Sequence, residues 1–277
     1  MSEYLVDSGA LTATAEKIRE KGGASGEILW DEAKGFADAV EEIPAGGGIE
    51  GTYVIETYDN YPNLIKAKLI NQKRVRYYAF YGCSDLIEVD IPETITIIES
   101  GAFENCKKLN FDHLPIALRR IGQKAFMRNS ALSITSLPAG LTELGSYAFD
   151  QCGSLALTSL PAGITAIPER CFYSCSKMTL AELPGSVRSI SQQAFSNCAG
   201  ISIDEIPSSV TGIYAQAFFY CTGLTSLTFK GTPKSIASNA FTGCTNLTTI
   251  NVPWAEGAVA NAPWGATNAT INYNYTE

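Results

Sequence analysis

The side chains best suited to chemistry in this 277-residue chain are its eight cysteines. Seven of them recur at multiples of 23 residues, and the eighth, Cys171, lies four residues before one of these positions. Such even spacing singles out no disulfide pairs, and a zinc site would need close pairs such as Cys-x-x-Cys. The pattern predicts a buried ladder of reduced thiols that hydrogen-bond to nearby backbone, with no metal site. The ladder positions are Cys83, Cys106, Asn129, Cys152, Cys175, Cys198, Cys221 and Cys244.

The remaining residues give little support to catalysis or cofactor binding. His113 is the only histidine, which excludes most multi-histidine metal sites and weakens an acid–base mechanism. No serine or cysteine nucleophile motif lies beside it. The glycines at 46–48 lack the Lys-Ser/Thr of a phosphate-binding loop. We therefore expect no catalytic residues, no cofactor and no metal, and a solvated position for His113.

The cysteine ladder is part of a longer repeat that must position all of these side chains. A phenylalanine, here called the anchor, recurs every 23 residues without insertion or deletion. One such unit cannot bury its own apolar face, so units of this kind stack into a solenoid with a continuous core. The eight anchors are Phe80, Phe103, Phe126, Phe149, Phe172, Phe195, Phe218 and Phe241.

Other columns keep the register of the anchors and predict the elements of each unit. Apolar residues stand six and eleven residues after the anchor, and proline follows the second of these in all units but one. We expect a short strand between these columns, ended by the proline, in a parallel sheet along the stack. The Ala-Phe segment predicts a short helical turn. A further apolar column contains Ile98, Ile121, Leu144, Ile167, Ile190, Ile213 and Ile236.

The apolar pattern differs between the middle and the ends of the repeat. The first unit reads Leu86-x-x-Val89-x-Ile91, and the last two units follow the same pattern. The middle units instead place an apolar residue two positions after the first one, as in Leu155-x-Leu157. Because a shift of one residue turns side chains to the other face of a strand, we expect a bulge or register change between these groups.

The unit Ile-Gly-x-x-Ala-Phe-x-x-Cys-x-x-Leu…Leu-Pro resembles the BspA-type leucine-rich repeat, over about residues 69–252. The resemblance implies an extracellular or surface-exposed binding protein without a catalytic centre, similar to adhesins. The predicted fold is α/β: a leucine-rich-repeat solenoid of about eight 23-residue units with a parallel sheet, preceded by a small two-helix segment.

The flanking segments predict three further parts of the chain. Residues 8–43 show apolar stripes at helical spacing, so residues 1–48 are interpreted as a helical segment with a glycine linker. This segment resembles the N-terminal module of tail-associated proteins of phages and prophages, which implies attachment to a virion or to other copies. Residues 49–68 are expected to cap the first turn. Residues 253–277 are expected to cap the last, with an edge strand near Thr270.

Two sets of side chains are candidates for a ligand-binding surface. The first is aromatic and lies near the anchors, at a position that we expect to be exposed because other units carry Glu104 or Asp150 there. The second is polar and flanks the predicted strands. The candidates are Tyr81, Tyr173, Tyr214, Phe219 and Tyr220, together with Asp112, His113, Glu182, Asp204 and Glu205.

Composition and charge limit the class of function. A net charge of −8 argues against a nucleic-acid partner, although residues 60–130 hold 11 basic and 7 acidic residues, a possible contact for an acidic partner. No apolar run is long enough to span a membrane, and the first residues predict no secretory signal peptide. The favoured hypothesis is a non-catalytic scaffold that recognises a protein or glycan, associated with a virion or phage tail. The alternatives are a bacterial cell-surface adhesin and an intracellular protein-interaction scaffold.

Overall fold

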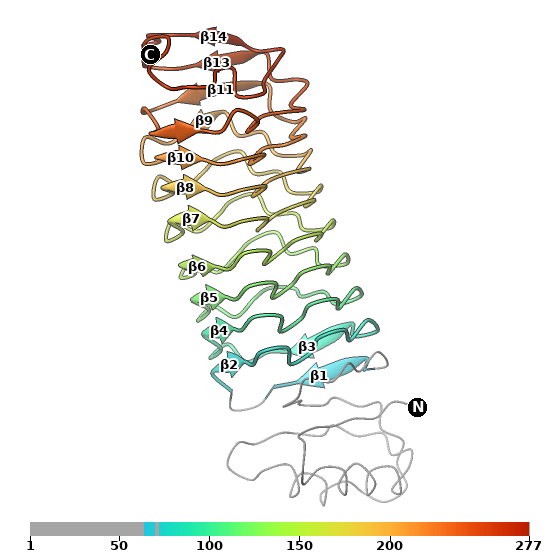
Figure 1. Ribbon diagram of the computed structural model, residues 1–277. Coiled ribbons are helices and arrows are strands. Elements are labelled where there is room, and N and C mark those ends of the chain that lie inside the picture. The colour runs from blue at the N-terminus through green and yellow to red at the C-terminus, as the bar shows by residue number, and fades with distance from the viewer. Residues whose placement is uncertain (1–63, 70–71, 277) are drawn as a thin grey trace, which may run out of the picture.

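The chain forms an elongated solenoid in which each repeat makes one turn (Figure 1). This computed structural model describes residues 64–69 and 72–276, which make about nine turns. All paired strands are parallel and belong to neighbouring turns. The predicted helical segment within residues 1–48 and most of the predicted N-terminal cap lie outside the described residues.

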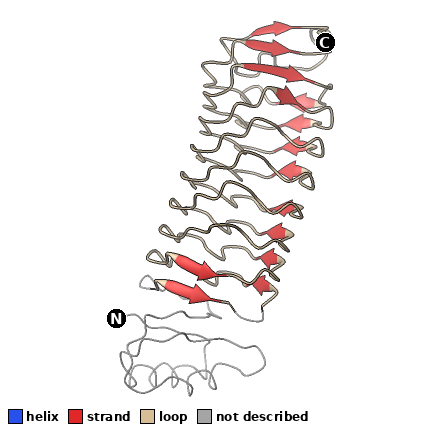
Figure 2. Cartoon of the chain, turned by 180° about the vertical axis from the view of Figure 1, so that it is seen from behind, coloured by secondary structure: helices blue, strands red, loops and turns tan. Residues whose placement is uncertain are grey.

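Eight strands of two residues form what we call the second strand row, which stacks along one side of the solenoid (Figures 1 and 2). They coincide with the apolar Ile98-type column, for which the sequence had predicted no strand. In nearly every one of them the second residue is buried in the core. The strands are β2 (Arg74–Val75), β4 (Ile97–Ile98), β5 (Arg120–Ile121), β6 (Glu143–Leu144), β7 (Ala166–Ile167), β8 (Ser189–Ile190), β10 (Gly212–Ile213) and β12 (Ser235–Ile236).

A proline divides the second strand row into two four-stranded sheets, one ending at β6 and the other beginning at β7. In other turns the residue after the strand donates its N–H to the strand one turn earlier. Gly145 donates to the Ile121 carbonyl at 2.8 Å, and Ser191 to the Ile167 carbonyl at 2.9 Å. Pro168 occupies this position after β7 and has no N–H to donate to Leu144. The sheet is therefore interrupted where the donor is missing.

We call the strands that form between the two predicted apolar columns the first strand row. They form only near the two ends of the solenoid, so the prediction of a strand in every unit is wrong. In the end units the buried residues alternate, as Leu227 and Phe229 do, and alternation suits an extended strand. In the middle units the buried residues are three apart, as Leu157 and Leu160 are, and no strand forms there except the two-residue β9, which pairs with the end-unit strand β11. The first-row strands are β1 (Lys66–Lys68), β3 (Glu88–Asp90), β9 (Glu205–Ile206), β11 (Ser226–Phe229), β13 (Thr249–Asn251) and β14 (Thr270–Asn272).

The anchor phenylalanines form one continuous stack through the core. Neighbouring rings are nearly parallel, with centroids 5.1–5.6 Å apart. All eight rings are buried, as are the leucine-type residues that follow them. Each turn thus packs its own apolar face against the turns above and below, as the repeat predicts.

The segment around each anchor is a series of turns, and no helix forms within residues 64–69 and 72–276. The predicted helical turn is wrong because residues two before and two after the anchor adopt left-handed backbone conformations, which interrupt a helix. Lys124 and Arg128, for example, have φ values of 57° and 64°. Between them, the Phe126 N–H donates to the Ala148 carbonyl of the next turn at 2.8 Å. We call the outer surface of these segments the turn face.

The last turns are closed by tryptophans and by the predicted edge strand, β14. Trp264 is fully buried, and its ring centroid lies 6.2 Å from that of Phe229 and 6.3 Å from that of Trp254. The Trp264 carbonyl accepts the N–H of the last anchor, Phe241, at 2.9 Å. The indoles thus cover core residues that a further turn would otherwise cover.

Candidate functional site

The position directly after the anchor lies on the turn face, and its acidic residues are buried rather than exposed as the sequence had suggested. Asp150 has no exposed surface, and Glu104 is nearly as buried. The expectation failed because a basic residue of the following turn covers each acid. The Arg170 Nε donates to the Asp150 Oδ2 at 2.7 Å. Lys124 stands in the corresponding place for Glu104.

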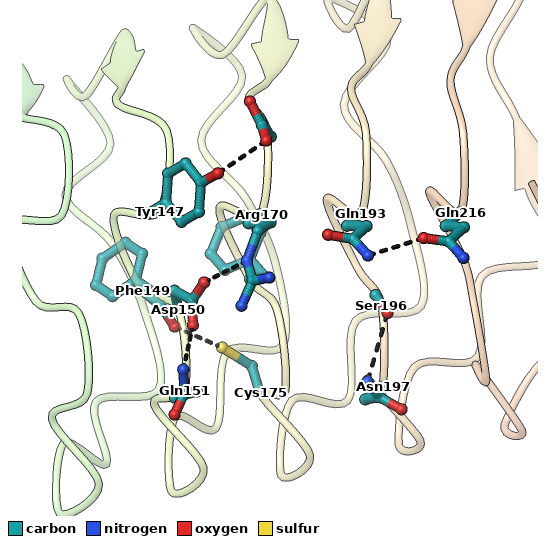
Figure 3. Close-up of polar contacts among 12 residues, drawn as sticks. Tyr147, Phe149, Asp150, Gln151, Arg170, Cys175, Gln193, Ser196, Asn197 and Gln216 are labelled. Atoms are coloured by element: carbon teal, nitrogen blue, oxygen red, sulfur yellow. Dashed lines mark hydrogen bonds and ion pairs between the residues drawn. The ribbon is translucent and has the colours of Figure 1, made fainter.

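Arg170 organises the centre of the turn face (Figure 3). Its guanidinium carbon lies 3.8 Å from the ring centroid of Tyr173 and 5.4 Å from that of Tyr147, both of which give cation–π contacts. Gln151 Nε2 also donates to the Asp150 Oδ1 at 3.0 Å. The Arg170 side chain keeps 24% of its surface exposed, so the buried Asp150 fixes its position while part of it remains accessible to solvent.

The charges of this cluster are fixed by their neighbours. Burial disfavours the Arg170 guanidinium, but the hydrogen bond and charge of Asp150 outweigh it and raise the pKa of Arg170. Tyr147 donates its hydroxyl to the Glu169 Oε1 at 2.8 Å. This hydrogen bond, together with burial, raises the pKa of Tyr147. At neutral pH the cluster therefore presents an arginine cation and a protonated phenol in set orientations.

Sequence reasoning included Tyr173 among the candidates but missed Tyr147, Asp150 and Arg170. A signal was present, because an acid directly after one anchor is followed 20 residues later by a basic residue at Glu104 and Lys124 and again at Asp150 and Arg170. The spacing is one repeat less three residues, which places the two side chains on neighbouring turns.

Amide side chains continue the turn face toward the C-terminus. Gln193 Nε2 donates to Gln216 Oε1 of the next turn at 2.8 Å (Figure 3). The Gln216 backbone N–H donates to Asn239 Oδ1 of the next turn at 3.2 Å. Asn197 Nδ2 lies 3.4 Å from Ser196 Oγ in the same region. Planar amides beside aromatic rings can recognise the hydroxyls of a glycan or the backbone of a peptide.

The other aromatic candidates divide into two groups along the axis. Tyr214 and Tyr220 near the seventh anchor are 52% and 50% exposed, and Phe219 packs edge-on against Tyr220 with centroids 4.5 Å apart. Tyr81 near the first anchor packs edge-on against Tyr78 at 5.8 Å. Six turns, roughly 30 Å, separate the two groups, so these residues do not form one compact site.

The polar candidates lie in or level with the first strand row, three of them in units that form no strand there, and all are exposed. His113 Nε2 lies 2.7 Å from Glu93 Oε1, and Glu205 forms an ion pair with Lys230 at 2.8 Å. The backbone N–H of Ile116 and the His113 ring lower the pKa of Glu93. Asp112, Glu182 and Asp204 are exposed beside them. This surface is distinct from the turn face, so the ten candidates belong to separate regions.

The cysteine ladder is buried, and its thiols are free, as predicted. In six rungs the thiol lies 2.9–3.1 Å from the carbonyl oxygen of an anchor phenylalanine one turn earlier. Cys171 occupies the small position directly before the anchor, where other units carry alanine. Burial raises the pKa of Cys198 to about 12. Among the described residues, no cluster of histidine, cysteine or acidic side chains could hold a metal ion.

Two crystal structures share the architecture described above. A leucine-rich repeat protein from Bacteroides ovatus ATCC 8483 matches with a TM-score of 0.53 and 20% identity, over 83% of this chain and 66% of that one. A leucine-rich cell surface protein from Faecalibacterium prausnitzii A2-165 matches with a TM-score of 0.51 and 25% identity, over 69% of this chain. The chain spans just under two thirds of the first protein and about 59% of the second.

The remaining comparisons concern sequence. A search among curated proteins finds no match. The residues that the structure describes contain no helix long and apolar enough to span a membrane. The family model for the BspA-type leucine-rich repeat region matches residues 56–179 and 165–256 in overlapping segments. These matches contain all eight anchors, and the chain therefore belongs to the BspA-type leucine-rich repeat family.

Proposed function

We propose that this chain is a non-catalytic binding scaffold whose turn face recognises a protein or a glycan at a cell surface. The observation that carries the proposal is the Arg170 cluster, in which ion pairing and cation–π contacts fix a partly exposed guanidinium and two partly exposed phenols before any ligand arrives. A surface ordered in advance loses little side-chain entropy on binding. The name of the Faecalibacterium relative, a cell surface protein, supports the location.

The exposed rings of Tyr214 and Tyr220 extend this surface and allow a test that spares the core. The full chain is applied to arrays of glycans and of extracellular-matrix proteins, beside the variant Tyr214→Ala/Tyr220→Ala. We expect at least about a tenfold loss of binding in the variant, as for aromatic contacts of a binding surface. Tyr275→Ala, which removes a partly exposed ring elsewhere, is the matched control. Equal binding by all three proteins would contradict the proposal.

Attachment to a virion or to other copies through residues 1–48 is a separate hypothesis about residues outside the described ranges. Comparing the molar mass of the full chain with that of a chain lacking residues 1–48, by light scattering, tests the self-association part. If the number of chains per particle is the same with and without residues 1–48, the self-association hypothesis is wrong.

A further inference from the structure

A column of basic residues and threonines runs along the outside of the second strand row. Its members directly precede the eight strands of that row, and nearly all of them are exposed. Cations and threonines alternate within each of the two sheets that Pro168 separates. We call this column the basic strip: Lys73, Thr96, Arg119, Thr142, Thr165, Arg188, Thr211 and Lys234.

Backbone hydrogen bonds hold the strip in register. The N–H of Thr96 donates to the Lys73 carbonyl at 2.8 Å, and the same bond recurs through Arg119 to Thr142. A second run joins Thr165 to Lys234 in the same way, at 2.8 Å per step. The cations are therefore held at a set spacing within each of the two runs, although their side chains can adjust.

Three of the four threonine hydroxyls in the strip are used by the backbone. Thr96, Thr142 and Thr211 each place Oγ1 3.0–3.3 Å from the carbonyl oxygen of the cationic residue one turn earlier. Arg119 also uses Nη1 for two local carbonyls, those of Ala117 and Leu118, at 3.1 and 3.2 Å. The other N–H donors of the Arg119 guanidinium stay available to a ligand.

The neighbouring positions add positive charge and little negative charge. Glu143 is the only acidic residue exposed among those that the structure describes in the strip and the second-row strands. The buried Glu99, directly after β4, is shared by Arg74 and Arg120 at 3.3 and 2.7 Å. A chain with a net charge of −8 thus carries a basic line on one side. Such separation of charge creates a field that attracts an anionic partner.

The spacing of the cations indicates the kind of anion. Turns are about 5 Å apart, so cations two or three turns apart lie roughly 10–16 Å from one another. A DNA duplex carries one charge per about 1.7 Å of its axis, far denser than this line. A polysaccharide with one acidic group in every second sugar is also linear and carries widely spaced charges. We infer that the basic strip binds a linear acidic polysaccharide laid along the solenoid axis.

This inference concerns a different face from the proposed ligand site, and it is tested with hyaluronan. Binding of the full chain is measured by calorimetry at several salt concentrations, with neutral dextran of similar length as the uncharged probe. We expect hyaluronan to bind at about 50 mM salt and weaken steeply as salt rises, and dextran not to bind. In Arg188→Gln/Lys234→Gln the affinity should fall at least about tenfold. The slope of log affinity against log salt, which is negative, should become shallower by roughly two.

The matched control is Lys107→Gln/Lys177→Gln, which loses the same charge at exposed positions away from the strip. It should retain hyaluronan affinity within about twofold, since surface charges so far away are screened. Circular dichroism verifies that both variants fold, and Arg119→Gln replaces the strip variant if that one does not.

The inference would be overturned by absent hyaluronan binding, by equal losses in both double variants, or by tighter binding of a single-stranded oligonucleotide. Failure here leaves the turn-face proposal intact, because the Arg170 cluster and Tyr220 lie outside the strip. Conversely, a Tyr220→Ala chain should bind hyaluronan as the wild type does.

Discussion

The thiol of Cys152 lies 2.9 Å from the carbonyl oxygen of Phe126, one turn earlier in the stack. The same contact links Cys175 to Phe149 at 3.1 Å. Six of the seven ladder cysteines therefore link their own turn to the anchor residue of the preceding turn. The Phe126 carbonyl also accepts the Asn129 N–H at 3.2 Å, so the thiol supplies its second hydrogen bond in an apolar interior.

Burial of the ladder predicts thiols that do not react in the folded protein. Burial raises the pKa of Cys198 and of Cys244 to about 12, so almost no thiolate exists at pH 8. We expect a disulfide reagent such as DTNB to label none of the eight cysteines quickly in the native chain and all eight in guanidinium. Rapid labelling of even one thiol in the native protein would contradict the ladder.

Asn129 is a weak rung, and replacing it by cysteine should stabilise the protein. Its Oδ1 accepts the Cys106 N–H at 2.9 Å, but its buried Nδ2 has no partner in the described structure. In Asn129→Cys the thiol can donate to Phe103, while the Cys106 N–H keeps its bond to that carbonyl at 3.3 Å. We expect a gain of about 1 kcal/mol.

Thermal unfolding measures this gain as a rise of roughly 2–4 °C in Tm. Ala139→Cys, which adds a thiol at an exposed position, serves as the control and should leave Tm unchanged. A lower Tm for Asn129→Cys would show that the amide contributes more than its unpaired nitrogen costs.

Gly243 and Tyr220 should be coupled, because the tyrosine ring lies where a side chain at 243 would project. A Cβ on Gly243 would come within 2.9 Å of the ring, and Gly243 has a φ of +81°. We expect Gly243→Ala to cost about 1–3 kcal/mol in unfolding free energy. In the Tyr220→Ala background the ring clash is absent and the cost should fall to about 1 kcal/mol, from the left-handed backbone alone.

Chemical denaturation of the two single variants and the double variant measures this coupling. Gly153→Ala is the control, since a Cβ there meets nothing within 4 Å. Additive costs for the 220 and 243 substitutions would show that the ring does not rest on Gly243.

Glu104 should make stability depend on pH. Burial raises the pKa of Glu104, although Lys124 and Arg128 partly offset it. The folded state thus holds this proton more tightly than the unfolded chain does, and ionisation penalises the folded state as pH rises above about 4.3. We expect Glu104→Gln to be more stable than the wild type at pH 7, with the difference vanishing near pH 3.

Urea unfolding at both pH values measures that difference. Glu143→Gln removes an exposed carboxylate and should change stability little at either pH. A Glu104→Gln chain that is less stable at pH 7 would mean that the attraction of Lys124 and Arg128 exceeds the cost of burial.

The stacking of turns, the phenylalanine core and the cysteine ladder can all be predicted from the amino-acid sequence. These follow because one residue type recurs at one spacing, and identical turns place identical residues directly above one another, as in Phe149 and Phe172. The break between β6 and β7 was also present in the sequence, as Pro168, but its meaning depended on which residues form the second strand row.

Which columns become strands, and which polar residues are buried, depends on contacts between turns that the repeat pattern does not reveal. The sequence placed the strands at Leu155-type segments, whereas the short strands form at Ile167-type segments, because the inward residues of the middle units are three apart. Asp150 is buried because Arg170 from the next turn covers it. Such a contact depends on how far neighbouring turns are offset, and the offset is set by packing between turns rather than by any single repeat.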